Sequence, residues 1–347
     1  QVLQAWQAQS AAMQKATRGL RMFIRLVYAI HRDPGMAQVA DILEQDVGAE
    51  VRQDLLGMAG AVNRFVMPPF RLEPAKLAVL ISKTQKNMHG VADLEGHNLG
   101  HGLYPLASFF NHSCAPNAVV SFRGNSLVVR CLDPIPAGSE ITIAYVELYA
   151  PREMRQKQLQ LKKGFLCQCP RCLLPKNDAQ ERKISDGRED VANKAREGWD
   201  KGLVQYQSGE FRASKATLDG VLQIMDGWLG AEHQMVYETH KLLVDVCLEL
   251  GDSAGVERHA QDALRCMLAH LHSSHPSIAL LSIHLARAML ERASGPDAEP
   301  ECAAAAEHAR RACKVLRVAY GADHPSLAEA EALLDLANRR TEEARRT

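Results

Sequence analysis

The first part of the chain follows a helical pattern of apolar and polar positions. In 20–30 (LRMFIRLVYAI) apolar residues recur three and four positions apart, which is the spacing of an amphipathic helix. The pattern breaks at 32–35 (RDPG) and 66–70 (VMPPF), where proline and glycine end helices. Strand-like alternation is scarce here, so residues 1–80 are predicted to be helical.

The pattern changes to strand-like alternation in residues 100–147. Two β-rich runs, 118–122 (AVVSF) and 126–132 (SLVVRCL), are separated by Arg-Gly-Asn at 123–125, which is a hairpin signal. In 141–147 (ITIAYVE) alternate residues would face opposite sides of a further strand. These runs predict a small β-rich domain with many loops.

The rest of the chain returns to helical patterning. Residues 151–164 are charged and helical, and Gly164 is placed to end that helix. The polar segment 173–187 is typical of a linker, and residues 188–347 are predicted to be helical almost throughout. The predicted fold class is therefore α+β, with a helical first part, a small β-rich core and an all-α C-terminal region.

A short motif recurs along the C-terminal region. It reads LGAEHQM at 229–235, LHSSHPS at 271–277 and YGADHPS at 320–326, and its histidines lie 42 and 49 residues apart. Each copy precedes a helical run, and a tetratricopeptide-like array of stacked helix pairs explains such a period. An irregular helical bundle is the alternative. In an array the histidines occupy equivalent positions of successive units, so they are expected to lie too far apart to share a metal ion.

Composition narrows the classes of function. The chain has 347 residues, 46% hydrophobic and 24% charged, which suits about two or three domains with buried cores. Lys plus Arg and Asp plus Glu both number 41, so no net positive field for direct nucleic-acid binding is expected. No apolar run reaches the roughly 18–20 residues that cross a bilayer, and no signal peptide is evident, so no membrane association is expected.

The cysteines indicate a reducing compartment and a metal site. Nine cysteines show no spacing of a disulfide framework, and three of them crowd into 165–172 (FLCQCPRC). A structural zinc site is four-coordinate, so one more ligand is needed. Cys131, His112 and Cys114 are candidates, although Cys131 is expected to pack within its strand. A redox site is the alternative to zinc. Because Cys114 lies in a loop, the favoured set is Cys114, Cys167, Cys169 and Cys172.

The motifs together resemble a known family. The run 100–145 (GHGLYPLASFFNHSCAPNAVVSFRGNSLVVRCLDPIPAGSEITIAY), followed by FLCQCPRC, resembles the C-terminal part of a SET domain and its post-SET zinc loop. More narrowly, the chain resembles the SET and MYND domain protein-lysine methyltransferases, including their tetratricopeptide-like C-terminal domain. The resemblance is closest over 87–175 and less close over 188–347 and 1–80.

The resemblance implies the transfer of a methyl group from S-adenosylmethionine to a lysine of a histone or non-histone protein. It makes Tyr145 the tyrosine at the reaction centre and Cys114 the fourth ligand of a Zn²⁺ ion. Phe165 would lie against the adenine of the cofactor. The other residues that it implies around the cofactor are Asn87, Ser108, Phe110, Asn111 and His112.

The same resemblance implies the domain organisation. It makes 1–80 a helical insert, 81–164 the C-terminal part of the SET core, 165–175 the post-SET zinc loop and 188–347 the tetratricopeptide-like domain. The glycine-rich N-terminal part of the SET domain and the MYND zinc module are expected to be absent from this chain. No G-x-G motif precedes residue 90 and no cysteine precedes Cys114.

Two positions depart from the family pattern. Lys163 replaces a tyrosine that lines the lysine channel, where a cation would repel a substrate lysine, and His89 replaces an aromatic residue of some members. Lys163 and the missing glycine-rich loop motivate an alternative function, a non-catalytic SET-like scaffold that binds protein partners through its helical repeats. For either function we expect a monomer, located in the cytoplasm, the nucleus or both.

Overall fold

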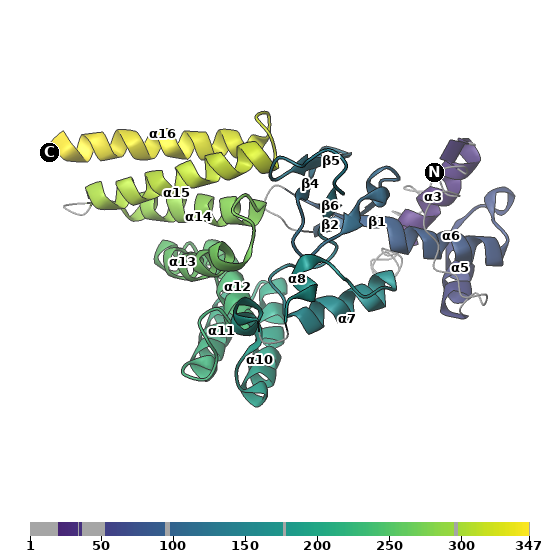
Figure 1. Ribbon diagram of the computed structural model, residues 1–347, viewed down its shortest axis with the longest axis horizontal. Coiled ribbons are helices and arrows are strands. Elements are labelled where there is room, and N and C mark those ends of the chain that lie inside the picture. Colours follow the sequence, from purple (N-terminus) through teal and green to yellow (C-terminus); the bar gives the residue numbers. More distant parts are fainter. Residues whose placement is uncertain are drawn as a thin grey trace. The chain divides into compact units, whose positions relative to one another are not determined.

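The computed structural model describes residues 20–33, 35–36, 53–93, 98–175, 178–294 and 298–346 (Figure 1). These residues divide into two compact units. The described residues of unit 1 fall within 1–93, 98–111 and 162–164, and those of unit 2 fall within 112–161 and 165–347. None of the described helices is both long enough and apolar enough to span a membrane.

The helices of unit 1 enclose a small apolar core. Their bounds are Arg21–Arg32 (α3), Gln53–Phe65 (α5), Pro68–Phe70 (η2) and Pro74–Asn87 (α6). Val27, Val62 and Ile81 are completely buried among them. The helix predicted from 20–30 is confirmed, and it ends at the RDPG sequence as expected. The predictions for 1–19, 34 and 37–52 lie outside the described residues.

Unit 1 also holds an antiparallel hairpin that the sequence patterns did not predict. β1 (Met88–Ala92) follows α6 directly and pairs with β2 (Asn98–Leu103). Gly102 is needed in β2, because a Cβ there would lie 2.6 Å from the Tyr104 ring. A short 3-10 helix, η3 (Ala107–Phe109), follows. The strands are short and rich in glycine and polar residues, so they lack the alternation that marks a strand in a sequence.

The predicted hairpin of unit 2 is confirmed. β4 (Ala118–Arg123) and β5 (Ser126–Cys131) pair antiparallel around a two-residue turn in which Gly124 has φ +58°. Cys131 is exposed at the end of β5, so the expectation that it packs within its strand is wrong.

The strand predicted over 141–147 is wrong for most of that range. β6 contains only Thr142–Ile143, and it pairs with the equally short β3 (Asn111–His112). The ladder ends because the backbone N–H of Tyr145 donates to Nδ1 of the His112 ring, at 3.0 Å, instead of to a neighbouring strand. This contact becomes important for the site described below.

Three helices precede, include and follow the cysteine-rich peptide along the chain. α7 (Arg152–Lys163) ends before Gly164, which has φ +80°, as predicted. α8 (Pro170–Leu173) carries the last cysteine of the cluster. The prediction of a linker over 173–187 is wrong, because this segment contains α9 (Ala179–Ser185), capped by the carboxylate of the preceding aspartate.

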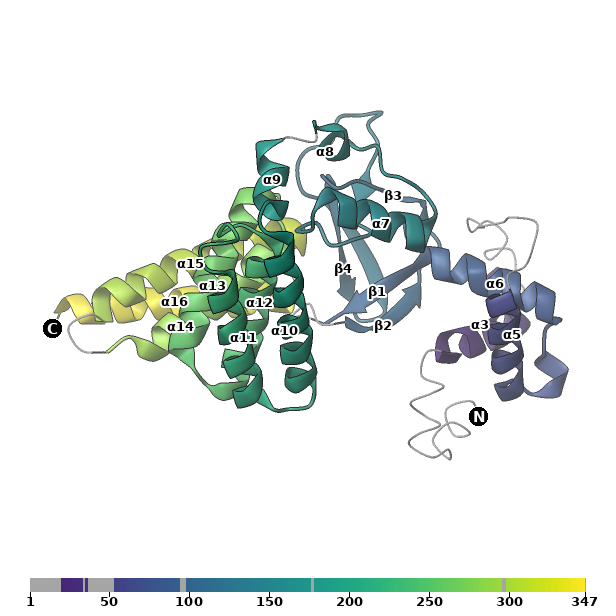
Figure 2. The ribbon, with the colours of Figure 1, turned by 90° about the horizontal axis from the view of Figure 1, so that it is seen from below.

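The C-terminal region is all-helical, as predicted, and each helix packs mainly on its neighbours in sequence (Figure 2). Such consecutive packing is the arrangement of an array of stacked helix pairs. The helices are Glu189–Gln207 (α10), Phe211–Met225 (α11), Gln234–Leu250 (α12), Ser253–His270 (α13), Pro276–Arg292 (α14), Ala298–Ala319 (α15) and Pro325–Arg346 (α16).

The three repeated histidines cap helices. The ring Nδ1 of His233 accepts the Met235 N–H at 3.1 Å, where α12 begins. His275 accepts a backbone N–H in the same way at the start of α14, and His324 does so at the start of α16, each at 3.3 Å. The recurring motif therefore marks recurring helix starts.

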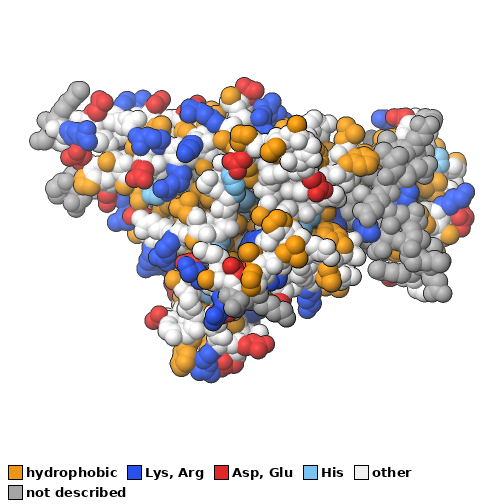
Figure 3. All heavy atoms as spheres, viewed as in Figure 1, with side chains coloured by type: hydrophobic (Ala, Val, Ile, Leu, Met, Phe, Trp, Pro, Cys, Tyr) orange, Lys and Arg blue, Asp and Glu red, His pale blue; other side chains and the backbone are white. Residues whose placement is uncertain are grey.

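Charges of both signs are interspersed on the helical region. Positive and negative side chains lie among one another on its face in Figure 3. Exposed ion pairs join its helices, such as Arg317–Glu331 at 2.8 Å between α15 and α16. Each exposed pair of this kind contributes only about 0–1 kcal/mol, so the helices depend mainly on their apolar faces.

A chain of polar contacts crosses the interior between α12 and α13. Arg258 lies 3.2 Å from Nε2 of His259, whose Nδ1 lies 3.1 Å from Nδ1 of His240. Arginine can only donate, so His259 accepts at Nε2 and carries its proton at Nδ1. Burial, with the nearby His240 and Arg258, lowers the pKa of His259 to about 4, and burial also lowers the pKa of His240. Folding therefore favours the neutral form of both imidazoles.

This pair is expected to make stability depend on pH. The unfolded chain takes up a proton at His259 below about pH 6.5, while the folded chain resists it down to about pH 4, so stability falls as the pH falls through that window. Across the whole window the loss of folding free energy is on the order of 3 kcal/mol. Urea unfolding at pH 7.5 and pH 5 should show a smaller pH dependence for His259→Gln than for wild type. An exposed control, His101→Gln, should behave as wild type, and equal pH dependence in all three proteins would contradict the expectation.

Candidate functional site

Four cysteine sulfurs converge in unit 2. Cys114 comes from the loop after β3, Cys167 and Cys169 from the loop after α7, and Cys172 from α8. All four Sγ atoms lie within 4.8 Å of one another, and those of Cys114 and Cys172 are 3.5 Å apart. Four sulfurs on one zinc ion at 2.3 Å would be roughly 3.8 Å apart, so the set has the size of a tetrahedral site.

Donor groups point at these sulfurs from several directions. The backbone N–H of Cys114 donates to Cys169 Sγ at 3.3 Å, and that of Cys169 donates to Cys167 Sγ at 3.4 Å. The ring Nε2 of His112 lies 3.2 Å from Cys114 Sγ. Such donors stabilise thiolate rather than thiol, and thiolate is the form that binds metal.

Without a metal ion, the pKa values of the cluster's thiols shift in different directions. Hydrogen bonds to Cys169 and Cys172, together with burial, raise the pKa of the Cys114 thiol. Cys169 accepts from Cys114 and Cys172, which lowers its pKa. Burial raises the pKa of Cys167 to about 11. A divalent cation is therefore what would allow all four to ionise together, and the donor set fits zinc.

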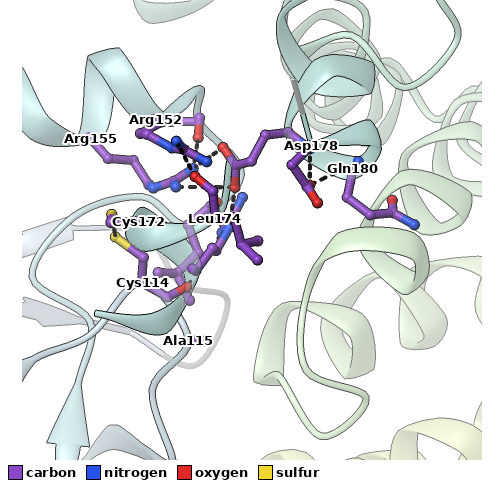
Figure 4. A network of polar contacts seen from close by, with 12 residues as sticks. Cys114, Ala115, Arg152, Arg155, Cys172, Leu174, Asp178 and Gln180 are labelled. Atoms are coloured by element: carbon purple, nitrogen blue, oxygen red, sulfur yellow. Dashed lines mark hydrogen bonds and ion pairs between the residues drawn. The ribbon is translucent and has the colours of Figure 1, made fainter. Parts of the chain in front are cut away.

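A buried ion network supports the cluster from the side of α9 (Figure 4). Glu181 accepts from both terminal nitrogens of Arg155, each at 3.1 Å, and from Nε of Arg171 at 2.6 Å. Arg171 also donates to the backbone oxygens of Leu148, at 2.8 Å, and Cys114, at 3.4 Å. Burial alone would raise the pKa of Glu181, but hydrogen bonds and charge from the two arginines hold it below its ordinary value.

Arg155 gives a further sign that the cluster carries negative charge. Its side chain is completely buried, and its Nε has no hydrogen-bond partner among the described residues. The Cys114 thiol is one of the groups that raise the pKa of this guanidinium. A metal held by four thiolates carries a net negative charge, and a buried arginine beside it compensates part of that charge.

The rings of Tyr145 and Phe165 both lie near the His112 ring. The ring centroid of His112 is 5.4 Å from that of Tyr145 and 6.3 Å from that of Phe165. Tyr145 and Val146 also pack against the cysteine cluster and Leu159. Burial lowers the pKa of His112 to about 4, so the ring is neutral near pH 7. Unit 2 thus brings together the predicted Tyr145, His112, Phe165 and the cysteines.

Unit 1 holds the other residues implied around the cofactor. Asn87 is buried at the end of α6, and its side-chain amide donates to Lys83 O at 2.7 Å. The hydroxyl of Ser108 donates to Asn87 O at 3.2 Å, so these two positions are joined. Phe110 is half-buried and Asn111 is exposed.

Lys163 has a structural partner within unit 1. Its ammonium group donates to the backbone oxygen of Lys86, near the C-terminus of α6, where a positive charge is favourable. Burial and the charge of Lys163 lower the pKa of His89 to about 4, and the His89 ring lies 6.1 Å from that of Tyr104. The position that departs from the family pattern therefore has a structural contact at the end of α6.

The sequence interpretation missed Arg155, Arg171 and Glu181. Arg155 and Glu181 lie in stretches that look like ordinary charged surface, a charged helix and a polar linker. One signal was present, the Asp-Ala-Gln-Glu of residues 178–181, which is a helix start. Recognising α9 would have placed Glu181 in a helix, but not beside two arginines.

Comparison with known proteins shows which sequences the chain resembles. The SET domain family matches residues 11–146. The chain is 27% identical over 301 residues to N-lysine methyltransferase SMYD2 of Gallus gallus, covering 83% of this chain and 66% of that protein. It is 26% identical to the Homo sapiens SMYD2 over 262 residues, which are 73% of this chain and 59% of that protein.

A shorter match is closer in identity. The histone-lysine N-methyltransferase ASHR1 of Arabidopsis thaliana is 43% identical over 115 residues, which are 33% of this chain and 24% of that protein. In each of these comparisons the matched part spans about two thirds or less of the relative's own length. With a SET-domain match over residues 11–146 and these relatives, the chain is similar to the SMYD-type SET-domain methyltransferases.

Proposed function

We propose that the protein transfers a methyl group from S-adenosylmethionine to a lysine side chain of a histone or non-histone protein. The observation that carries the proposal is the cluster of Tyr145, His112 and Phe165 around the SET-domain motif, packed on the four-cysteine loop. The proteins to which the chain is similar are lysine methyltransferases by name.

For this reaction the protein mainly has to align the amine with the methyl group and the sulfur. S-adenosylmethionine would supply an electrophilic methyl group on a sulfonium. The neutral lysine amine would attack that methyl carbon in line, and the sulfur would leave as the thioether of S-adenosylhomocysteine. What the protein contributes is the orientation of the amine and fixed dipoles for the moving charge. In the proposal the Tyr145 hydroxyl supplies one such dipole, while Phe165 offers a ring face to the adenine. Asn87, Ser108, Phe110, Asn111 and His112 are the proposed contacts of the cofactor.

The metal in this proposal is Zn²⁺, held by Cys114, Cys167, Cys169 and Cys172. Four thiolates leave no open coordination position, so the ion would have a structural role rather than activate water. It would tie the loop after β3 to the peptide between α7 and α8. Tyr145 packs against that junction, so the metal would support the reaction indirectly.

The proposal is tested by methyl transfer from labelled S-adenosylmethionine to histones and to a proteome extract. Tyr145→Phe removes one hydrogen-bonding dipole at the reaction centre and should lower the rate by roughly 100-fold. Tyr320→Phe, a tyrosine of the helical region, is the matched control and should retain the wild-type rate. Equal rates for all three proteins would remove Tyr145 from the reaction.

A second candidate function is that of a scaffold without catalysis, and Lys163 is the observation that favours it. Its ammonium group occupies a position where the family pattern has a tyrosine of the lysine channel. If the wild-type chain labels no protein while binding partners through α10–α16, the scaffold is the function. We also propose that the protein acts as a monomer in the cytoplasm, the nucleus or both, and that its helical region binds protein partners.

A further inference from the structure

We infer that His112 is a positioning residue that couples the four-cysteine cluster to the backbone of Tyr145. The inference rests on the proposed zinc site and on the proposed methyl transfer, and it assigns the imidazole a task besides any contact with the cofactor. Through this ring, the metal site and the backbone of the tyrosine at the reaction centre would fix each other's positions.

Both ring nitrogens of His112 are engaged. Nδ1 lies 3.0 Å from the backbone nitrogen of Tyr145, and Nε2 lies 3.2 Å from Cys114 Sγ. A backbone N–H can only donate, so Nδ1 accepts and the ring proton resides on Nε2. The Nε2–H then donates to the Cys114 sulfur. One neutral imidazole therefore satisfies a backbone donor on one side and a thiolate on the other.

The backbone around His112 keeps the ring in this orientation. The next residue, Ser113, donates its N–H to Ile143 O at 3.1 Å, two residues before Tyr145. The ring itself lies close to the rings of both Tyr145 and Phe165. The contact to Tyr145 also ends the β3–β6 ladder, which gives the 145 position an anchor outside the sheet.

A partner behind a metal ligand has a measurable effect. Groups that hydrogen-bond to ligands orient them and tune their basicity, and losing one typically costs about 10- to 100-fold in metal affinity. For His112 the loss should appear at the metal when Nε2–H is removed and at Tyr145 when the Nδ1 acceptor is removed. The two ends of the link are therefore separable.

Two substitutions separate them. The side-chain amide of asparagine reaches about as far as Nδ1, so His112→Asn keeps an acceptor for the Tyr145 N–H but loses the donor to Cys114. Glutamine reaches as far as Nε2, so His112→Gln keeps a donor to Cys114 but loses the acceptor. Zinc affinity is measured by competition with a chromophoric chelator. The setting of Tyr145 is followed by ¹⁹F NMR of the full chain labelled with 3-fluorotyrosine, with the resonance assigned by its loss in Tyr145→Phe.

We expect His112→Asn to bind zinc about 10- to 100-fold more weakly, with the Tyr145 resonance of the zinc-loaded form near its wild-type position. We expect His112→Gln to bind zinc within about threefold of wild type and to shift the Tyr145 resonance. The control is His275→Asn, which also alters a ring that accepts a backbone N–H but lies in the helical region. It should change neither readout.

The possible results separate failure of the His112 coupling from failure of the proposed zinc site. If the wild-type chain binds no zinc, the proposed metal site is wrong and the coupling is wrong with it. If the wild-type chain binds zinc and His112→Asn binds it equally well, the metal site stands and the coupling is overturned. A Tyr145 resonance that His112→Gln leaves in place would also overturn it.

Discussion

A Cys114→Ser variant is expected to bind zinc at least about 100-fold more weakly than the wild-type chain. Even the partners behind metal ligands cost about 10- to 100-fold when lost, and this change removes a ligand itself. The hydroxyl of serine does not ionise near neutral pH as a metal-bound thiol does. The loop after β3 would then lose its tie to the peptide 167–172, and the thermal unfolding temperature should fall together with zinc content.

Metal analysis of the purified chain and chelator competition measure the effect. Cys131→Ser is the matched control, because that thiol is exposed and lies outside the cluster. It should keep one zinc per chain and the wild-type unfolding temperature. Wild-type zinc affinity in Cys114→Ser would remove this residue from the metal site and reopen the choice of the fourth ligand.

Replacing Glu181 by alanine is expected to lower the free energy of unfolding by about 3–5 kcal/mol. The carboxylate is almost completely buried and faces the guanidinium groups of Arg155 and Arg171. Removing it leaves two buried cations without their anion, which costs far more than an exposed ion pair contributes. Because Arg171 also contacts the Cys114 backbone, zinc retention should weaken in the same variant.

Chemical unfolding of the zinc-loaded protein measures this change. Asp186→Ala is the control, since its ion pair with Arg182 lies at the end of the same short helix but is half-exposed on both sides. That variant should lose no more than about 1 kcal/mol. Equal losses for the two variants would mean that the buried network contributes no more than surface charge does.

Much of this architecture is predictable because local signals agree with the fold. The hairpin of β4 and β5 combines alternating apolar residues with a glycine turn, and α7 ends at a glycine. The cysteine set follows from a count, because three thiols in 165–172 are one ligand short of a closed site. Cys114, in a loop ahead of a strand, had the freedom to complete it.

The parts that were not predictable depend on contacts distant in sequence. The strand expected at 141–147 has suitable residues, but His112 takes the backbone N–H of Tyr145 and ends the ladder. The segment of α9 looks polar because its charged residues suggest solvent, yet Glu181 lies inside an arginine pair. Neither the apolar pattern nor local propensity records such long-range partners, so tertiary context decided both segments.

α9 also affects how the chain can be divided into modules. A polar stretch between a metal loop and a helical array looks like a hinge at which two independent parts could be separated. Here that stretch supplies the anion for Arg155 and Arg171, which lie on the side of the four-cysteine cluster. A fragment that ends at the last cysteine would lack Glu181. It would leave the guanidinium groups of Arg155 and Arg171 buried without their anion. A cut between the last cysteine and α9 would therefore separate Glu181 from both of its arginines.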